Sequence, residues 1–228
     1  MLEGGRPAAW MLRGALAGAE WFPGDPVYQK TADEIVRLLL SSYAQHGRLP
    51  GRQPVWEGQI VEGLAEYHRR TGRADVAAAI VGEVRHLLRD GLRRRPDGGF
   101  DVRYCYEETK CGKPWTDDEN YLFLWLGSVA YAGAISGDAR LTQWADVLFA
   151  YGAQRLVAKR HDIRTWTSVL GFPYLYVDLS ATRHRQGDRP YASKRRTSLP
   201  MRMTSPDMRT WGSRSDRYVP LRLDRSSR

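Results

Sequence analysis

A segment at residues 56–75, WEGQIVEGLAEYHRRTGRAD, constrains the fold of this chain more than any other feature. Its apolar residues recur at spacings of three and four, which is typical of a helix with one buried stripe. Gly72 is expected to end that helix, because a left-handed residue often closes a helix C-terminus. A second apolar stripe runs from Val76 to Leu88. The segment therefore predicts a helical hairpin with a tight corner.

The hairpin recurs upstream and downstream. The corners PGDP at 23–26, TGRA at 71–74 and SGDA at 136–139 each separate two helical patterns. One amphipathic hairpin cannot bury its stripe alone, so neighbouring hairpins must stack. The first helix of each pair is richer in Gly and Ala, so we expect the first helices inside and the second ones outside. The expected helical segments are 8–22, 27–46, the hairpin 55–95, Asp117 or Asp118 to 135, 140–159 and a last apolar segment at 163–179.

Residues 96–118 break the helical pattern. A Pro-Asp-Gly-Gly turn is followed by apolar and aromatic residues at alternate positions, from Phe100 to Tyr106, which predicts a short strand or β-hairpin at about 97–118. A connection this long between helices often carries function. The run Arg93–Arg95 before it is expected at a helix C-terminus, where cations are favourable. Cys105 and Cys111 are close enough in sequence to form a disulfide in an oxidising compartment.

Basic residues are concentrated at the C-terminal end. The chain has a formal net charge of +9. Residues 181–228 contain 13 Lys or Arg and 4 Asp, which accounts for the whole excess and leaves residues 1–180 neutral. We therefore predict a folded domain at 1–180 and a disordered basic tail at 181–228, whose composition also suits a non-native extension. A neutral body gives no reason to expect nucleic acid as a partner of that domain.

Membrane insertion and secretion are not indicated. The sequence has no run of eighteen apolar residues and no basic segment followed by a continuous apolar stretch near its start. We expect no membrane partner and a cytoplasmic location, with the reservation that the N-terminus is truncated if the chain is a fragment. The sequence does not indicate an oligomeric state.

The motif Gly-Leu-x-x-Tyr-x-x-x-Thr-Gly at 63–72, with DGGF at 97–100 and SGDARLTQWAD at 136–146, resembles the six-hairpin (α/α) toroids of glycoside hydrolases and polysaccharide lyases. The resemblance covers about residues 8–180. It implies an all-α fold of tandem hairpins, with three hairpins and part of a fourth, fewer than a closed ring requires. We therefore expect an incomplete toroid and a carbohydrate substrate.

The loops that lead into the first helices are expected to meet on one rim. Aromatic rings stack on sugar faces, and glycoside hydrolysis needs one carboxylic acid and a second carboxylate as base or nucleophile. Glu57 with Asp118, or with Asp117 in its place, is the leading pair, and Glu107 and Glu108 lead into the same edge. The candidate catalytic residues are Glu57, Asp117, Asp118 and His161. The candidate substrate-binding residues are Trp56, Gln59, Tyr104, Tyr106, Trp115, Arg164 and Trp166.

Each candidate also has a structural interpretation. The two aspartates suit helix caps, Glu57 suits a first helical turn, and His161 suits an exposed helix end. The tryptophans Trp56 and Trp115 suit a core. Glu62 faces either the toroid lumen or solvent.

Three functions remain open at this stage. A glycoside hydrolase is preferred. A polysaccharide lyase acting on uronates would use a Tyr or His base with a neutralising cation, for which Tyr104, Tyr106, His161 and Arg164 are available. A non-catalytic helical scaffold is the third. We predict no cofactor and no metal site, since two cysteines without a paired histidine give little indication of zinc.

Overall fold

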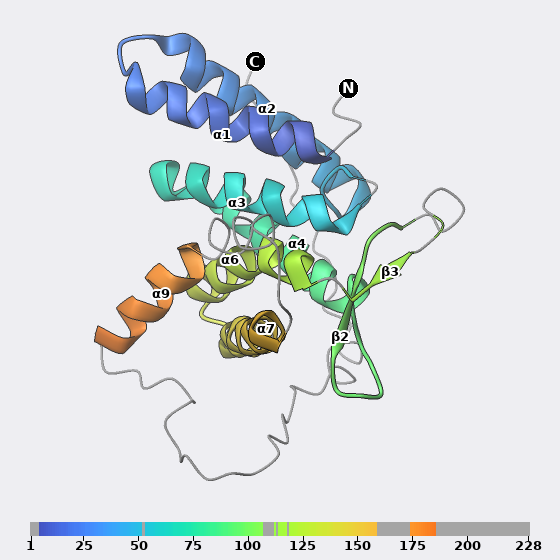
Figure 1. The fold of residues 1–228 in the computed structure, drawn as a ribbon. Helices are drawn as coiled ribbons and strands as arrows, with labels where there is room; N and C mark the ends of the chain where they lie inside the picture. Colours follow the sequence, from blue (N-terminus) through green and yellow to red (C-terminus); the bar gives the residue numbers. More distant parts are fainter. Residues whose placement is uncertain are drawn as a thin grey trace.

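The computed structural model describes residues 5–51, 53–106, 112, 114–117, 119–158 and 174–185. This part of the chain is mostly helical, with one small antiparallel sheet (Figure 1). The helices are α1 (Gly5–Trp21), α2 (Pro26–His46), α3 (Pro54–Thr71), α4 (Ala74–Asp90), α6 (Glu119–Ser136), α7 (Ala139–Ala158) and α9 (Tyr174–Arg185). The strands are β1 (Leu92–Arg94), β2 (Phe100–Arg103) and β3 (Trp115–Thr116). The all-α expectation with a short β element is confirmed.

The first helices of successive hairpins pack in chain order. Helix α3 contacts both α1 and α6, and α6 also contacts α9. The second helices α2, α4 and α7 each pack on their own first helix, and α4 also contacts α2 and α6. Figure 1 shows α1, α3 and α6 as successive levels of this stack. The hairpins therefore share one continuous apolar core, as the repeated stripes require.

Close backbone contact joins α3 to α6. A Cβ on Gly58 would lie 2.4 Å from the Trp125 ring and 2.7 Å from the carbonyl oxygen of Leu124, so only glycine fits there. The indole N–H of Trp125 donates to the Pro54 carbonyl at 3.1 Å, and the Ser128 hydroxyl donates to the Gly58 carbonyl at 2.8 Å. These buried bonds fix the position of α3 along α6.

Local signals set the ends of several helices. Asp25 accepts a hydrogen bond from the backbone N–H of Val27 at 2.9 Å and so caps α2. Gly72 ends α3 with φ of 65°, and its N–H donates to the His68 carbonyl. The sequence prediction for Gly72 is confirmed, and Gly47 closes α2 in the same conformation.

The end of the second hairpin differs from the prediction. Helix α4 stops at Asp90, and residues 92–94 form β1, which pairs antiparallel with β2. The expectation that Arg93–Arg95 lie at a helix C-terminus is wrong. Arg93 instead bonds Asp101 on the neighbouring strand at 2.6 Å, and its guanidinium lies 4.5 Å from the centre of the Trp115 ring. The neighbouring strand thus supplies an acidic cross-strand partner for Arg93.

The last described helix extends beyond the apolar segment expected at 163–179. Helix α9 continues past residue 180 and ends at Arg185, where Arg183 bonds Asp146 of α7 at 2.9 Å. Residues 186–228, which contain most of the predicted tail, lie outside the described residues. None of the helices that the structure describes is long and apolar enough to cross a membrane.

Candidate functional site

Glu57 lies in the first turn of α3 and is completely buried. The Tyr106 hydroxyl, from the segment after β2, donates to Glu57 Oε2 at 2.7 Å. A second completely buried carboxyl, that of Glu83 on α4, lies against Glu57. The structure therefore brings together one predicted catalytic residue, one predicted substrate-binding residue and a carboxyl that the sequence analysis did not select.

His86 extends this cluster toward the surface. It lies one turn beyond Glu83 on α4, and its Nε2 is 2.8 Å from the Tyr106 hydroxyl. Its Nδ1 is 2.9 Å from Oδ2 of Asp90, which is partly exposed. We call Glu57, Glu83, His86 and Tyr106 the carboxyl cluster. It spans three elements, because α3, α4 and the segment after β2 each supply at least one member.

Burial controls the ionisation of the carboxyl cluster. Loss of hydration raises the pKa of Glu57 well above its usual value, and the adjacent Glu83 raises it further, against the hydrogen bond from Tyr106. Burial also raises the pKa of Glu83 to about 6, opposed by a 2.7 Å hydrogen bond from the Leu49 backbone N–H. Burial lowers the pKa of His86. Burial thus favours the uncharged form of both carboxyls and of the imidazole.

Two arginines lie beside the cluster. The Arg48 guanidinium is 4.5 Å from the centre of the Tyr106 ring, and that of Arg103 is 5.3 Å from it. Both are within cation–π distance. Although these two positive charges are nearby, Glu57, Glu83 and His86 offer three potential metal ligand atoms within 4.8 Å of one another.

The other described candidates, apart from Gln59, contact residues outside the carboxyl cluster. Trp56 donates its indole N–H to the side chain of Gln53 and lies 4.9 Å from the Arg6 guanidinium. Gln59 is buried, and its Oε1 accepts no hydrogen bond from the described residues. The ring of Tyr104 lies 5.6 Å from that of Tyr121. Trp115 stacks with Arg93, as given above.

Asp117 is directed into a different set of contacts. Its carboxylate is exposed and pairs with Arg95 at 3.3 Å and with Arg155 at 3.5 Å. These arginines belong to the sheet region and to α7, so Asp117 makes surface ion pairs with both. Asp118, His161, Arg164 and Trp166 lie outside the described residues, as do Glu107, Glu108 and Cys111. Cys105 is disulfide-bonded, and its predicted partner Cys111 is not among the described residues.

Two members of the carboxyl cluster, Glu83 and His86, could have been found from the pattern of apolar residues in the sequence. Glu83 falls on the apolar stripe of α4, since Val76, Ile80 and Leu87 lie seven and three residues before it and four after it. A carboxyl on such a stripe must be buried, and His86 follows on the same face. Glu62 is likewise a carboxyl on a buried face of its helix, α3. The solvated-face alternative for Glu62 is wrong, because the side chain is buried.

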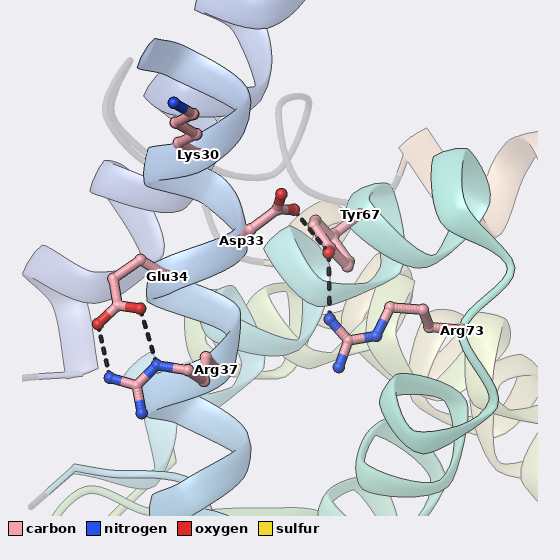
Figure 2. A pocket seen from close by; sticks show the side chains of 6 residues that line it. All are labelled: Lys30, Asp33, Glu34, Arg37, Tyr67 and Arg73. Atoms are coloured by element: carbon pink, nitrogen blue, oxygen red, sulfur yellow. Dashed lines mark hydrogen bonds and ion pairs between the residues drawn. The ribbon is translucent and has the colours of Figure 1, made fainter. Parts of the chain in front are cut away.

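A surface groove lies at the opposite end of α3. It has a volume of about 450 Å³ and is open to solvent (Figure 2). Figure 2 shows Tyr67 donating to Asp33 at 2.8 Å while accepting from Arg73, with Glu34 paired to Arg37 nearby. Its lining residues are Lys30, Asp33, Glu34, Arg37, Tyr67 and Arg73. None of the predicted site residues lines it.

No protein-family model matches the sequence, and no curated protein or solved structure matches it either.

Proposed function

We propose that this chain forms part of the wall of an (α/α)-toroid carbohydrate-active enzyme, a glycoside hydrolase in preference to a lyase. The observation that carries the proposal is the 2.7 Å hydrogen bond between Tyr106 and Glu57. It joins the long connection after α4 to the first turn of α3, as expected where aromatic rings and acids converge on a sugar. The stack of first helices α1, α3, α6 and α9 supports the toroid interpretation.

Glu57 is the proposed general acid. A glycosidase acid must hold its proton near neutral pH, which requires a raised pKa, and the burial of Glu57 beside Glu83 has that effect. Glu83 is not the second catalytic carboxylate, because the two carboxyls are in contact, whereas paired glycosidase carboxylates are separated by about 5 to 10 Å. The second carboxylate remains assigned to Asp118. Since Glu57 is covered, a sugar reaches it only after Tyr106 moves.

The lyase alternative requires a Tyr or His base, for which Tyr104, Tyr106 and His161 are the candidates. Burial and the neighbouring carboxyl of Glu57 raise the pKa of Tyr106 far above its usual value, so its phenolate is strongly disfavoured. This observation disfavours Tyr106 as the base and so supports our preference for hydrolysis over elimination.

The test is product analysis with a panel of neutral and uronate-containing polysaccharides. A hydrolase releases reducing ends without new ultraviolet absorbance, while a lyase also creates a carbon–carbon double bond that absorbs. Glu57→Gln should lower the rate by about 100-fold or more, because general acid catalysis contributes 10²–10⁴. The exposed Glu34→Gln is the matched control. Glycan binding without turnover, or full activity of Glu57→Gln, contradicts the assignment.

A further inference from the structure

We propose that Glu57, Glu83 and His86 form a binding site for a divalent transition-metal cation, with Zn²⁺ the best fit. Two helices supply the donors, Glu57 from α3 and the other two from α4. One oxygen of each carboxyl and one imidazole nitrogen lie within 4.8 Å of one another. Zn²⁺ holds nitrogen and oxygen ligands at about 2.0–2.2 Å, so small side-chain rotations bring all three onto one ion.

Unpartnered oxygens inside the cluster provide the second observation. Glu57 and Glu83 are both completely buried. Each has one oxygen, Oε1, that receives no hydrogen bond from the described residues. Two buried carboxylates in contact repel each other and need a positive charge between them. A proton shared by the pair supplies one charge, whereas a divalent cation neutralises both carboxylates and also occupies the unpartnered oxygens.

The imidazole of His86 is already held in the orientation that a metal ligand requires. Its Nδ1 contacts the Asp90 carboxylate at 2.9 Å, and its Nε2 points into the cluster toward the Tyr106 hydroxyl. Histidines that bind metals commonly direct the other ring nitrogen to a carboxylate, which fixes the ring and increases its basicity as a ligand. An imidazole with two carboxylates favours Zn²⁺ and related transition metals over Ca²⁺ and Mg²⁺, which prefer oxygen ligands alone.

The neighbouring groups set the limits of the site. The Tyr106 hydroxyl lies between Nε2 of His86 and Oε2 of Glu57, so it either becomes a fourth ligand or moves aside. Arg48 and Arg103 stack on the Tyr106 ring and oppose a cation electrostatically. This inference does not depend on the proposed reaction. If both hold, bound metal removes the proton from Glu57, so metal binding and acid catalysis exclude each other.

Calorimetric titration of the untagged full chain with ZnCl₂ tests the site directly. We expect one saturable site and an increase in melting temperature, since a ligand that binds only the folded state stabilises it. Glu83→Gln and His86→Gln should each weaken binding by at least about tenfold, and Asp90→Asn by about tenfold, because outer partners typically contribute 10–100-fold. CaCl₂ should bind far more weakly than ZnCl₂.

Glu62→Gln is the matched control, because Glu62 is a buried carboxyl on α3 outside the cluster. Its Zn²⁺ affinity should equal that of the wild type, and Arg48→Gln should bind more tightly, since it removes an opposing charge. The proposal is overturned if no saturable binding occurs, or if Glu83→Gln and His86→Gln retain the affinity of Glu62→Gln. Equal binding of Ca²⁺ and Zn²⁺ would overturn the assignment to a transition metal.

Discussion

The two ends of helix α3 contain the same pair of groups in opposite environments. Near its start, Tyr106 donates to the buried Glu57 at 2.7 Å, and near its end Tyr67 donates to Asp33 at 2.8 Å. The first pair lies against another carboxyl, that of Glu83. The second opens into a solvent-exposed groove and receives a hydrogen bond from Arg73. The same hydrogen bond therefore ends on a buried, high-pKa carboxyl at one end of α3 and on the exposed carboxyl of Asp33 at the other, although Tyr67 itself is buried.

The comparison shows that burial, more than residue type, determines what these carboxyls do. Glu57, Glu62 and Glu83 are buried and have raised pKa values. At the corner between α3 and α4, Arg73 lowers the pKa of Asp75 through a 2.6 Å hydrogen bond. Function is therefore expected at the buried end, where the ionisation of carboxyls departs from that in water.

The largest expected effect is on the pH dependence of stability. Burial raises the pKa of Glu62 from 4.5 to about 8, with Arg13 3.8 Å away opposing the shift. Between these values the folded protein keeps a proton that the unfolded chain has released, so stability falls as pH rises. Over this pH interval, Glu62 alone lowers the free energy of unfolding by about 5 kcal/mol. Urea unfolding of Glu62→Gln from pH 4.5 to 8 should show a much flatter profile than wild type.

The control for the Glu62→Gln profile is a variant of an exposed carboxyl, Glu34→Gln. Glu34→Gln should leave the wild-type slope unchanged, because Glu34 is exposed and its pKa is lowered by Arg37. If Glu62→Gln also keeps the wild-type slope, Glu62 ionises normally in the folded state and the contrast between buried and exposed carboxyls is lost.

The second-largest expected effect is a difference in stability between the Tyr106→Phe and Tyr67→Phe variants. Tyr106→Phe leaves Glu57 Oε2 and His86 Nε2 without their common partner in a buried site, which should cost about 1–3 kcal/mol. Tyr67→Phe should cost about 1 kcal/mol or less, since its acceptor Asp33 is exposed and water replaces the lost hydrogen bond there. Chemical denaturation of both variants at pH 7 measures the difference. Equal losses would show that the cluster is as well hydrated as the groove.

The smallest expected effect is at the groove. Glu34 and Arg37 form a 2.6 Å ion pair on the exposed face of α2. Such pairs are screened by solvent and salt, so Glu34→Gln should leave the melting temperature unchanged at 0.15 M salt. A clear decrease, measured by circular dichroism, would contradict the view that this groove is an ordinary surface network.

Periodic features of the fold could be predicted from the sequence, and side-chain convergence could not. The spacing of apolar residues located the hairpins, and Gly72 located a helix end. The same periodicity extended α4 too far, because the residues after Gly91 are as compatible with a strand as with a helix. In the candidate site, the pairing of Glu57 with Tyr106 was consistent with the expected rim. Glu83 and His86 were missed, because the interior is formed only when α4 packs against α3.

The contact between Gly58 and Trp125 has a mechanical consequence. With the indole wedged against a residue that lacks a side chain, and with Trp125 and Ser128 hydrogen-bonded to backbone carbonyls of α3, the two helices cannot slide past one another by a turn. Any opening above Glu57 must therefore leave α3 and α6 in register with each other.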